Sequence, residues 1–405
     1  MFLRFSALIV IVLTTQIVNS QTKNEIEFNK YASQQDSLMM DAYNKRDTSG
    51  YRKILESFII NFSKFDKSNQ ESFDSYLLNA YYNFACTYSI TGNNQKALDY
   101  LEKSKYTDYG HLLVDSDLDN LRKEKRFEKC LSYAHKYLFK NLDTLKKASK
   151  YNIDDKTVIP AFTYQSANDS NLMKLRKLYK LDSIAGNGNE ISRFINLMRW
   201  VHNIIRHDGS KGIPSKRNAL DMITICKNEN KTLNCRGLAI LLNDVYLSMG
   251  YQSRFVTCLP KDSTDNDCHV INMVYSRTFQ KWIWIDPTFE AYVMDEKGDL
   301  LSLQEVRERL INGKPLILNP DANWNRSSSQ SKEGYLYDYM AKNLYRLQCP
   351  ISSEFNYEQG VAKYCELIPV DYLEYIKKDK SKDNRIIISS DYQTLNPNLF
   401  WTKPE

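Results

Sequence analysis

The sequence has 405 residues, of which 42% are hydrophobic and 26% are charged, and its formal net charge is +6. This composition is typical of a folded globular protein, and the length favours two or three domains. The basic residues are scattered along the chain rather than gathered in one stripe, which argues against a nucleic-acid-binding protein.

The first twenty residues, "MFLRFSALIVIVLTTQIVNS", combine an early Arg4, an apolar run and the small residue Ser20. This pattern is typical of a secretory signal peptide that is cleaved after Ser20. The apolar run is shorter than the roughly 20 residues of a spanning helix, and an uncleaved anchor is the alternative. We therefore expect a secreted or periplasmic protein with no membrane span after signal cleavage.

Residues 24–149 are helix-patterned, and one stretch in them, "AYYNFACTYSITGNNQKALDYLEKSKYTDYG", has a more specific pattern. Gly92 lies at its turn, and Tyr109 replaces the usual proline near the end of the second helix. The large and small positions of the helix pair are occupied by Tyr81, Phe84, Ala85, Tyr88, Ala97 and Leu101. The stretch resembles a tetratricopeptide repeat, which implies a helical domain able to bind a protein partner. One repeat is too few for a stable solenoid, so we expect further helices on both sides; a plain helical bundle is the alternative.

The pattern changes after a predicted linker at 150–171. Helical segments at 172–184, at 190–206 and from Cys235 to Gly250 are followed by strands at 253–259, 268–276 and 281–286. Helices followed by antiparallel strands indicate an α+β fold. We predict one domain over 172–323, with a short helix and a strand after the last of these strands. A C-terminal extension at 324–405 is expected to pack on that domain and to contain a strand at "RIIISS".

Cys235 stands in "TLNC", directly before an apolar helical pattern. A cysteine attacks as its thiolate, and an unassisted thiol is mostly protonated at neutral pH. Asn234 can cap the helix, which would put Cys235 in the first turn, where the helix dipole favours an anion. Arg236 adds a positive charge unless it points to solvent. The alternative is a buried thiol of the core.

His269 begins one predicted strand, and Asp286 ends the next. If the two strands form a hairpin around "SRTFQ", the imidazole and the carboxylate lie side by side, as in a catalytic triad. Pro287 would end the second strand and hold Asp286 in place. His269 is therefore the preferred base among the five histidines.

Two stretches, "NCRGLAILLNDVYLSMGYQSRFVTC" and "DCHVINMVYSRTFQKWIWIDPTF", resemble the core of the transglutaminase-like superfamily. The resemblance implies a papain-like α+β core in which Cys235 is the nucleophile, His269 the general base and acid, and Asp286 the orienting carboxylate. The family often has glycine where Asn234 stands. Its oxyanion donors are usually an upstream side chain and the backbone N–H of the cysteine. The upstream candidates are Trp200, His202 and Asn234.

Several other residues could take part in chemistry, but the sequence favours structural roles for them. His202 and His207 in "WVHNIIRHDGS" are expected to cap or pack, although His207 and Asp208 could line a cleft. Trp282 and Trp284 are expected on one face of the sheet, as core or cleft wall. The cysteine pairs to test for disulfides are Cys258 with Cys268 and Cys349 with Cys365. No phosphate loop, zinc spacing or dinucleotide fingerprint occurs, so we expect no cofactor and no required metal.

The combined prediction is an exported protein that uses a Cys-His-Asp triad for acyl transfer or hydrolysis on a carboxamide or peptide bond of a protein or peptide substrate. Transfer to a lysine amine would be transglutamination, and transfer to water would be amidase or peptidase action. The alternative is a catalytically inactive scaffold that binds a peptide or glycan.

Overall fold

The computed structural model describes residues 23–404 apart from 46, 66–69, 149, 264, 266 and 379–389. The signal peptide predicted at 1–20 and most of the predicted "RIIISS" strand lie outside these residues. The chain divides into two compact units, Met1–Leu138 and Phe139–Glu405. The division precedes the predicted end of the helical region at 149, because Leu142 and Leu145 are buried in the core of the second unit.

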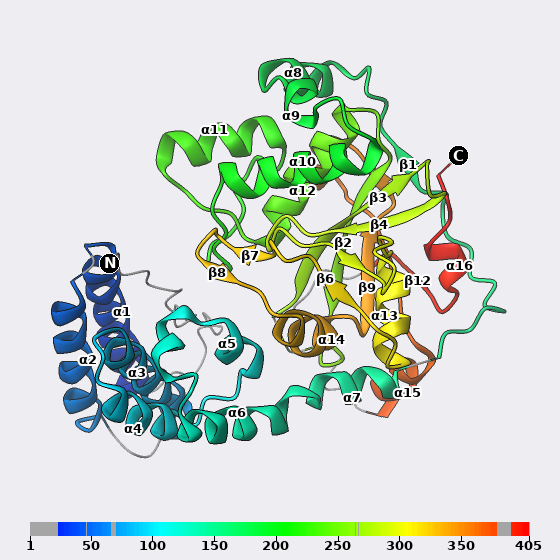
Figure 1. Ribbon diagram of the computed structural model, residues 1–405. Helices are drawn as coiled ribbons and strands as arrows, with labels where there is room; N and C mark the ends of the chain where they lie inside the picture. Colours follow the sequence, from blue (N-terminus) through cyan, green and yellow to red (C-terminus); the bar gives the residue numbers. More distant parts are fainter. Residues whose placement is uncertain are drawn as a thin grey trace. The chain divides into compact units, whose positions relative to one another are not determined.

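The described part of the first unit is helical (Figure 1). Its elements are α1 (Lys23–Asn44), α2 (Thr48–Phe62), α3 (Gln70–Ile90), α4 (Asn94–Ser104), α5 (Tyr109–Val114), the 3₁₀ turn η2 (Ser116–Leu121) and α6 (Lys125–Leu138). Helices α3 and α4 form the predicted pair, with the turn at Gly92, whose φ is 79°. Phe84 and Leu101 of this pair are buried in one core with residues of the flanking helices.

The second unit begins with α7 (Lys140–Lys147) and contains helices before and after its strands. The helices before the main strands are α8 (Ser170–Leu178), α9 (Leu181–Ala185), α10 (Glu190–Ile204), α11 (Ala219–Glu229) and α12 (Cys235–Ser248). The later helical elements are α13 (Leu303–Ile311), the π-helix η3 (Glu333–Met340), α14 (Ala341–Asn343), η4 (Tyr357–Gln359), α15 (Val370–Lys378) and α16 (Pro397–Phe400). The α+β class predicted from the sequence is confirmed.

The central sheet has the strand order β12-β11-β9-β2-β3-β4. Its strands are β2 (Ser253–Leu259), β3 (His269–Ser276), β4 (Lys281–Ile285), β9 (Arg346–Pro350), β11 (Tyr364–Leu367) and β12 (Tyr392–Thr394). Two-residue strands form small pairs: β1 (Thr163–Tyr164) with β10 (Ser352–Ser353), β5 (Val293–Met294) with β6 (Ile317–Leu318), and β7 (Asn323–Trp324) with β8 (Ser328–Ser329). Residues 324–405 therefore complete the sheet rather than only packing on it.

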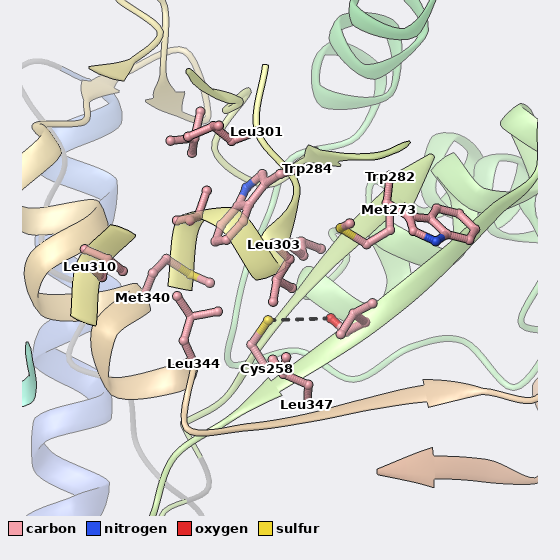
Figure 2. Close-up of a cluster of buried hydrophobic side chains, with 14 of the residues drawn as sticks. Cys258, Met273, Trp282, Trp284, Leu301, Leu303, Leu310, Met340, Leu344 and Leu347 are labelled. Atoms are coloured by element: carbon pink, nitrogen blue, oxygen red, sulfur yellow. Dashed lines mark hydrogen bonds between the residues drawn. The ribbon is translucent and has the colours of Figure 1, made fainter. Parts of the chain in front are cut away.

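Alternating side chains place a core on each face of this sheet. Val270 and Ile285 face the side covered by α10, α11 and α12. Met273, Trp282 and Trp284 face the other side, where α13, η3 and α14 contribute side chains (Figure 2). The two tryptophans share one face because they are two residues apart in a strand, as predicted.

All eight cysteines are free thiols in the structure. Cys258 is buried among the side chains of Figure 2 and its Sγ lies 3.9 Å from the Val256 carbonyl, so the predicted pairing with Cys268 is not formed. Cys349 and Cys365 are direct partners in the β9–β11 register but are not bonded to each other. In the described part of the chain, no helix has the length and apolar character needed to span a membrane.

Candidate active site

Cys235 is the first residue of α12 and is partly exposed to solvent. The predicted cap is confirmed, since the Asn234 side chain accepts a hydrogen bond from the Gly237 N–H at 3.1 Å. The first turn of a helix carries N–H groups without intrahelical partners and the positive end of the helix dipole. The rest of α12 is buried from Gly237 to Ser248, so the sheet and neighbouring helices hold the thiol on a rigid element.

His269 and Asp286 meet across the predicted hairpin of β3 and β4. Asn272 pairs with Ile285 in the antiparallel ladder. His269 and Asp286, the residue after Ile285, therefore lie diagonally across the ladder from each other. The His269 Nε2–H donates to Asp286 Oδ2 at 2.7 Å, and both side chains are buried. This bond leaves Nδ1 of His269 as the nitrogen that can exchange a proton with a thiol.

Further hydrogen bonds hold the Asp286 carboxylate. The backbone N–H of Thr288 donates to Oδ1 at 2.8 Å, and the Tyr335 hydroxyl donates to Oδ2 at 2.6 Å. The Tyr339 hydroxyl lies 3.4 Å from His269 Nδ1. Both tyrosines belong to η3, and π-helical turns occur frequently at functional sites. The sequence patterns gave no signal for these two residues.

The pKa values of the three groups are shifted toward an ion pair. Burial acts to raise the pKa of Cys235, but hydrogen bonds with His207 and His269 and the positive charge of His269 lower it to about 6. Burial acts to lower the pKa of His269, but the charge and hydrogen bond of Asp286 raise it to about 10. Burial would raise the pKa of Asp286, and the facing His269 keeps it below its usual value. At neutral pH these directions favour a thiolate beside an imidazolium.

His207 is the second imidazole beside the Cys235 sulfur. The backbone of His207 forms a parallel β-bridge with Leu233, which lies two positions before Cys235. The Trp324 indole N–H donates to His207 Nδ1 at 2.9 Å. From the sequence, His207 was expected to cap, to pack or to line a cleft. Its contact with Trp324 was not predicted, because Trp324 lies far away in the chain.

Two of the sequence-predicted oxyanion candidates have other partners. His202 is buried, and its ring nitrogens lie 3.0 Å from the Pro287 carbonyl oxygen and 3.0 Å from Asn323 Oδ1. It therefore fixes the chain directly after Asp286. The Trp200 ring packs against Tyr179 with 5.5 Å between centroids. These contacts of the two side chains do not include Cys235.

Arg236 does not act as a free positive charge next to Cys235. Its guanidinium donates to Glu358 Oε1, to the Thr257 hydroxyl and to the Tyr364 hydroxyl. The Glu358 side chain is almost fully buried, so this network ties the start of α12 to the chain between β10 and β11. Its role in the structure is to hold the first turn of α12 in position.

Searches against protein-family models and against curated proteins gave no match for this chain. Among solved structures, the chain is similar to a protein from Cytophaga hutchinsonii that is provisionally described as a cysteine protease. The match has 18% sequence identity and a TM-score of 0.25, and covers 39% of this chain and 51% of that one. A TM-score of this size does not define a common fold, so any functional assignment rests on the residues of the site itself.

Proposed function

We propose that the second unit is a thiol-dependent acyltransferase or hydrolase with Cys235 as the nucleophile, His269 as the general base and acid, and Asp286 as the orienting carboxylate. The observation that carries the proposal is the hydrogen-bonded chain from Asp286 through His269 to the thiol of Cys235, a partly exposed residue at a helix N-terminus. Each group has the environment that its role requires.

The chemistry follows from the position of each proton. The Cys235 thiolate attacks the carbonyl carbon of an amide, and the carbon–oxygen π electrons move to the oxygen. When the tetrahedral intermediate collapses, the carbon–nitrogen bond breaks and His269 Nδ1–H protonates the leaving amine. His269 then takes a proton from water or a second amine, which attacks the thioester and releases the product and the thiolate.

We extend this proposal to the type of core, the substrate, export and the partner of the first unit. The sequence resemblance to the transglutaminase-like superfamily and the helices-then-hairpin order support a papain-like core that acts on a protein or peptide carboxamide. The hydrophobic N-terminal twenty residues support export. The helical first unit, with its tetratricopeptide-like pair, is proposed to bind a protein partner.

The test uses two small probes on the full-length protein without its first twenty residues. Iodoacetamide reports the thiolate, and p-nitrophenyl acetate reports acylation through the release of p-nitrophenolate. We expect wild-type protein to release p-nitrophenolate and to form an acetyl thioester at Cys235, detected by mass spectrometry. The Cys235→Ala variant should do neither above the buffer rate.

Cys130→Ala and Cys268→Ala are matched controls, because these are the other partly exposed thiols and should leave acylation unchanged. Wild-type ester cleavage no faster than that of Cys235→Ala would overturn the enzymatic proposal and favour a binding scaffold. Adding a fluorescent primary amine separates the two reactions: incorporation of the amine into a glutamine-containing protein indicates transglutamination, and release of ammonia or peptide fragments without incorporation indicates hydrolysis.

A further inference from the structure

The backbone of His207 is held in place by its neighbours on both sides. The His207 N–H donates to Asn325 Oδ1 at 2.7 Å, and the Asn325 side-chain amide donates back to the His207 carbonyl at 2.9 Å. The residues on either side of His207 are hydrogen-bonded to Leu233. The Asp208 N–H donates to the Leu233 carbonyl, and the Leu233 N–H donates to the Arg206 carbonyl. His207 is thus tied to the chain that leads directly into Cys235.

The Trp324 indole determines which nitrogen of His207 carries the proton. An indole N–H is a donor without acceptor capacity, so Nδ1 of His207 must accept and cannot itself be protonated while this bond exists. The proton of the neutral ring then lies on Nε2, the nitrogen left to interact with Cys235. A turn with positive φ at Asn325 (54°) and Arg326 (61°) connects β7 to β8 and places Trp324 and Asn325 together.

The two imidazoles beside the sulfur therefore have different chemistry. His269 is joined to a carboxylate and exchanges a proton through Nδ1. His207 is joined to a donor, so it cannot accept a second proton without losing the Trp324 bond, and it can only donate through Nε2. When a carbonyl carbon bonds to this sulfur, its oxygen lies next to the sulfur, within hydrogen-bond reach of a group that donates to the resting sulfur.

We propose that His207 is a catalytic residue of this site and that its Nε2–H, with the backbone N–H of Cys235, donates to the oxyanion of the tetrahedral intermediate. This inference rests on the proposed function and names the oxyanion donor that the sequence did not identify. Trp324 is a positioning residue, because it acts through the tautomer of His207. No proton is consumed at His207: its N–H bond stays intact throughout attack and collapse.

The test compares two reactions of the same thiolate. Alkylation by iodoacetamide displaces iodide at a saturated carbon and forms no oxyanion, whereas attack on p-nitrophenyl acetate forms one. Both rates are measured above the ionisation midpoint of each variant, so that the thiolate fraction is equal. We expect His207→Leu to reduce acylation about 10²-fold to 10³-fold while alkylation changes by less than about twofold.

Two more variants separate a donor from a structural residue. His207→Gln retains an N–H donor and should restore acylation to within about tenfold of wild type. Trp324→Phe keeps an aromatic ring but frees Nδ1, so acylation should fall several-fold while alkylation is retained. Equal losses in both reactions together with a lower melting temperature, or unchanged acylation in His207→Leu, would overturn the proposal. If wild-type protein cleaves the ester no faster than Cys235→Ala, the proposed function itself fails, which is a different result.

Discussion

At the scale of single residues, Cys235 differs from the other cysteines in its neighbours. Two imidazoles lower its pKa to about 6, whereas burial raises the pKa of Cys130 to about 11 and that of Cys268 to about 12. Partial exposure is common to all three thiols, so exposure does not set the expected reactivity. The difference comes from the histidines, and it can be measured without knowing a substrate.

The pH dependence of alkylation tests this difference. Cys235 should react with iodoacetamide at least about tenfold faster than Cys130 or Cys268 at pH 7, because mainly Cys235 is ionised there. Its rate should rise with a midpoint near pH 6, and the imidazolium partner should be lost near pH 10. Mass spectrometry of tryptic peptides after timed alkylation gives each rate, and a midpoint near 8.5 for Cys235 would contradict the ion pair.

Replacing Asp286 tests the source of the histidine charge. In Asp286→Asn the negative charge that raises the pKa of His269 is gone, so the imidazolium is less stable and stabilises the thiolate less. The alkylation midpoint of Cys235 should move up toward about 8.5, and acylation by p-nitrophenyl acetate should fall about 10²-fold to 10⁴-fold. The Asp295→Asn variant, in a turn outside the site, is the control and should leave both values unchanged.

At the scale of elements, the site is built where α12, the β3–β4 hairpin and η3 meet. Two substitutions of the α12 cap, Asn234, separate the effect of the cap on protein stability from its effect on the charge near Cys235. Asn234→Ala should lower the free energy of unfolding by about 1 kcal/mol, because the Gly237 N–H loses its acceptor. Asn234→Asp retains the acceptor and should keep that stability.

The two variants should also differ in the pH midpoint of Cys235 alkylation. A carboxylate at position 234 repels the thiolate, so the alkylation midpoint of Asn234→Asp should rise by about 1 pH unit relative to wild type. Urea unfolding and alkylation profiles of the two variants provide the comparison. A lower midpoint in Asn234→Asp would show that position 234 acts on Cys235 by some route other than charge.

The elements nearest the triad could be predicted from the sequence because their signals are local. "SRFVTCL" coincides with β2, and "KWIWID" contains β4, since β-branched and aromatic residues mark buried strands. The hairpin then follows from two adjacent strands and a short turn. The cap at Asn234 was likewise predicted from residue type and position alone.

The remaining parts of the site depend on contacts between distant segments. β9 and β11 are short, and β9 pairs with β2 on one side and with β11 on the other, so no local pattern marks them as strands of the same sheet. Tyr335 reaches Asp286 from a π-helix, a geometry that tertiary packing rather than local propensity selects. His207 Nδ1 accepts a hydrogen bond from Trp324, which lies 117 positions further along the chain, so no local pattern predicted this contact.

At the scale of the whole molecule, the two compact units have separate cores. Leu101 is buried in the core of the first unit and Leu238 in that of the second. Leu101→Ala should cost about 2–5 kcal/mol in the unfolding of the first unit and change acylation at Cys235 by less than about twofold. Leu238→Ala should cost a similar amount and reduce acylation with it. Calorimetry together with p-nitrophenolate release distinguishes these outcomes, and equal loss of acylation in both variants would contradict independent units.

The strand order of the sheet has a consequence for the time course of biosynthesis. Chains fold from the N-terminus as they are made, and Cys235, His269 and Asp286 all emerge before Trp324, Tyr335 and β9. A nascent chain that ends near Asn323 therefore contains the whole triad, while β2 still lacks its β9 neighbour and Asp286 lacks the Tyr335 hydroxyl. β2 and Asp286 therefore gain these partners only after all three residues of the triad have been synthesised.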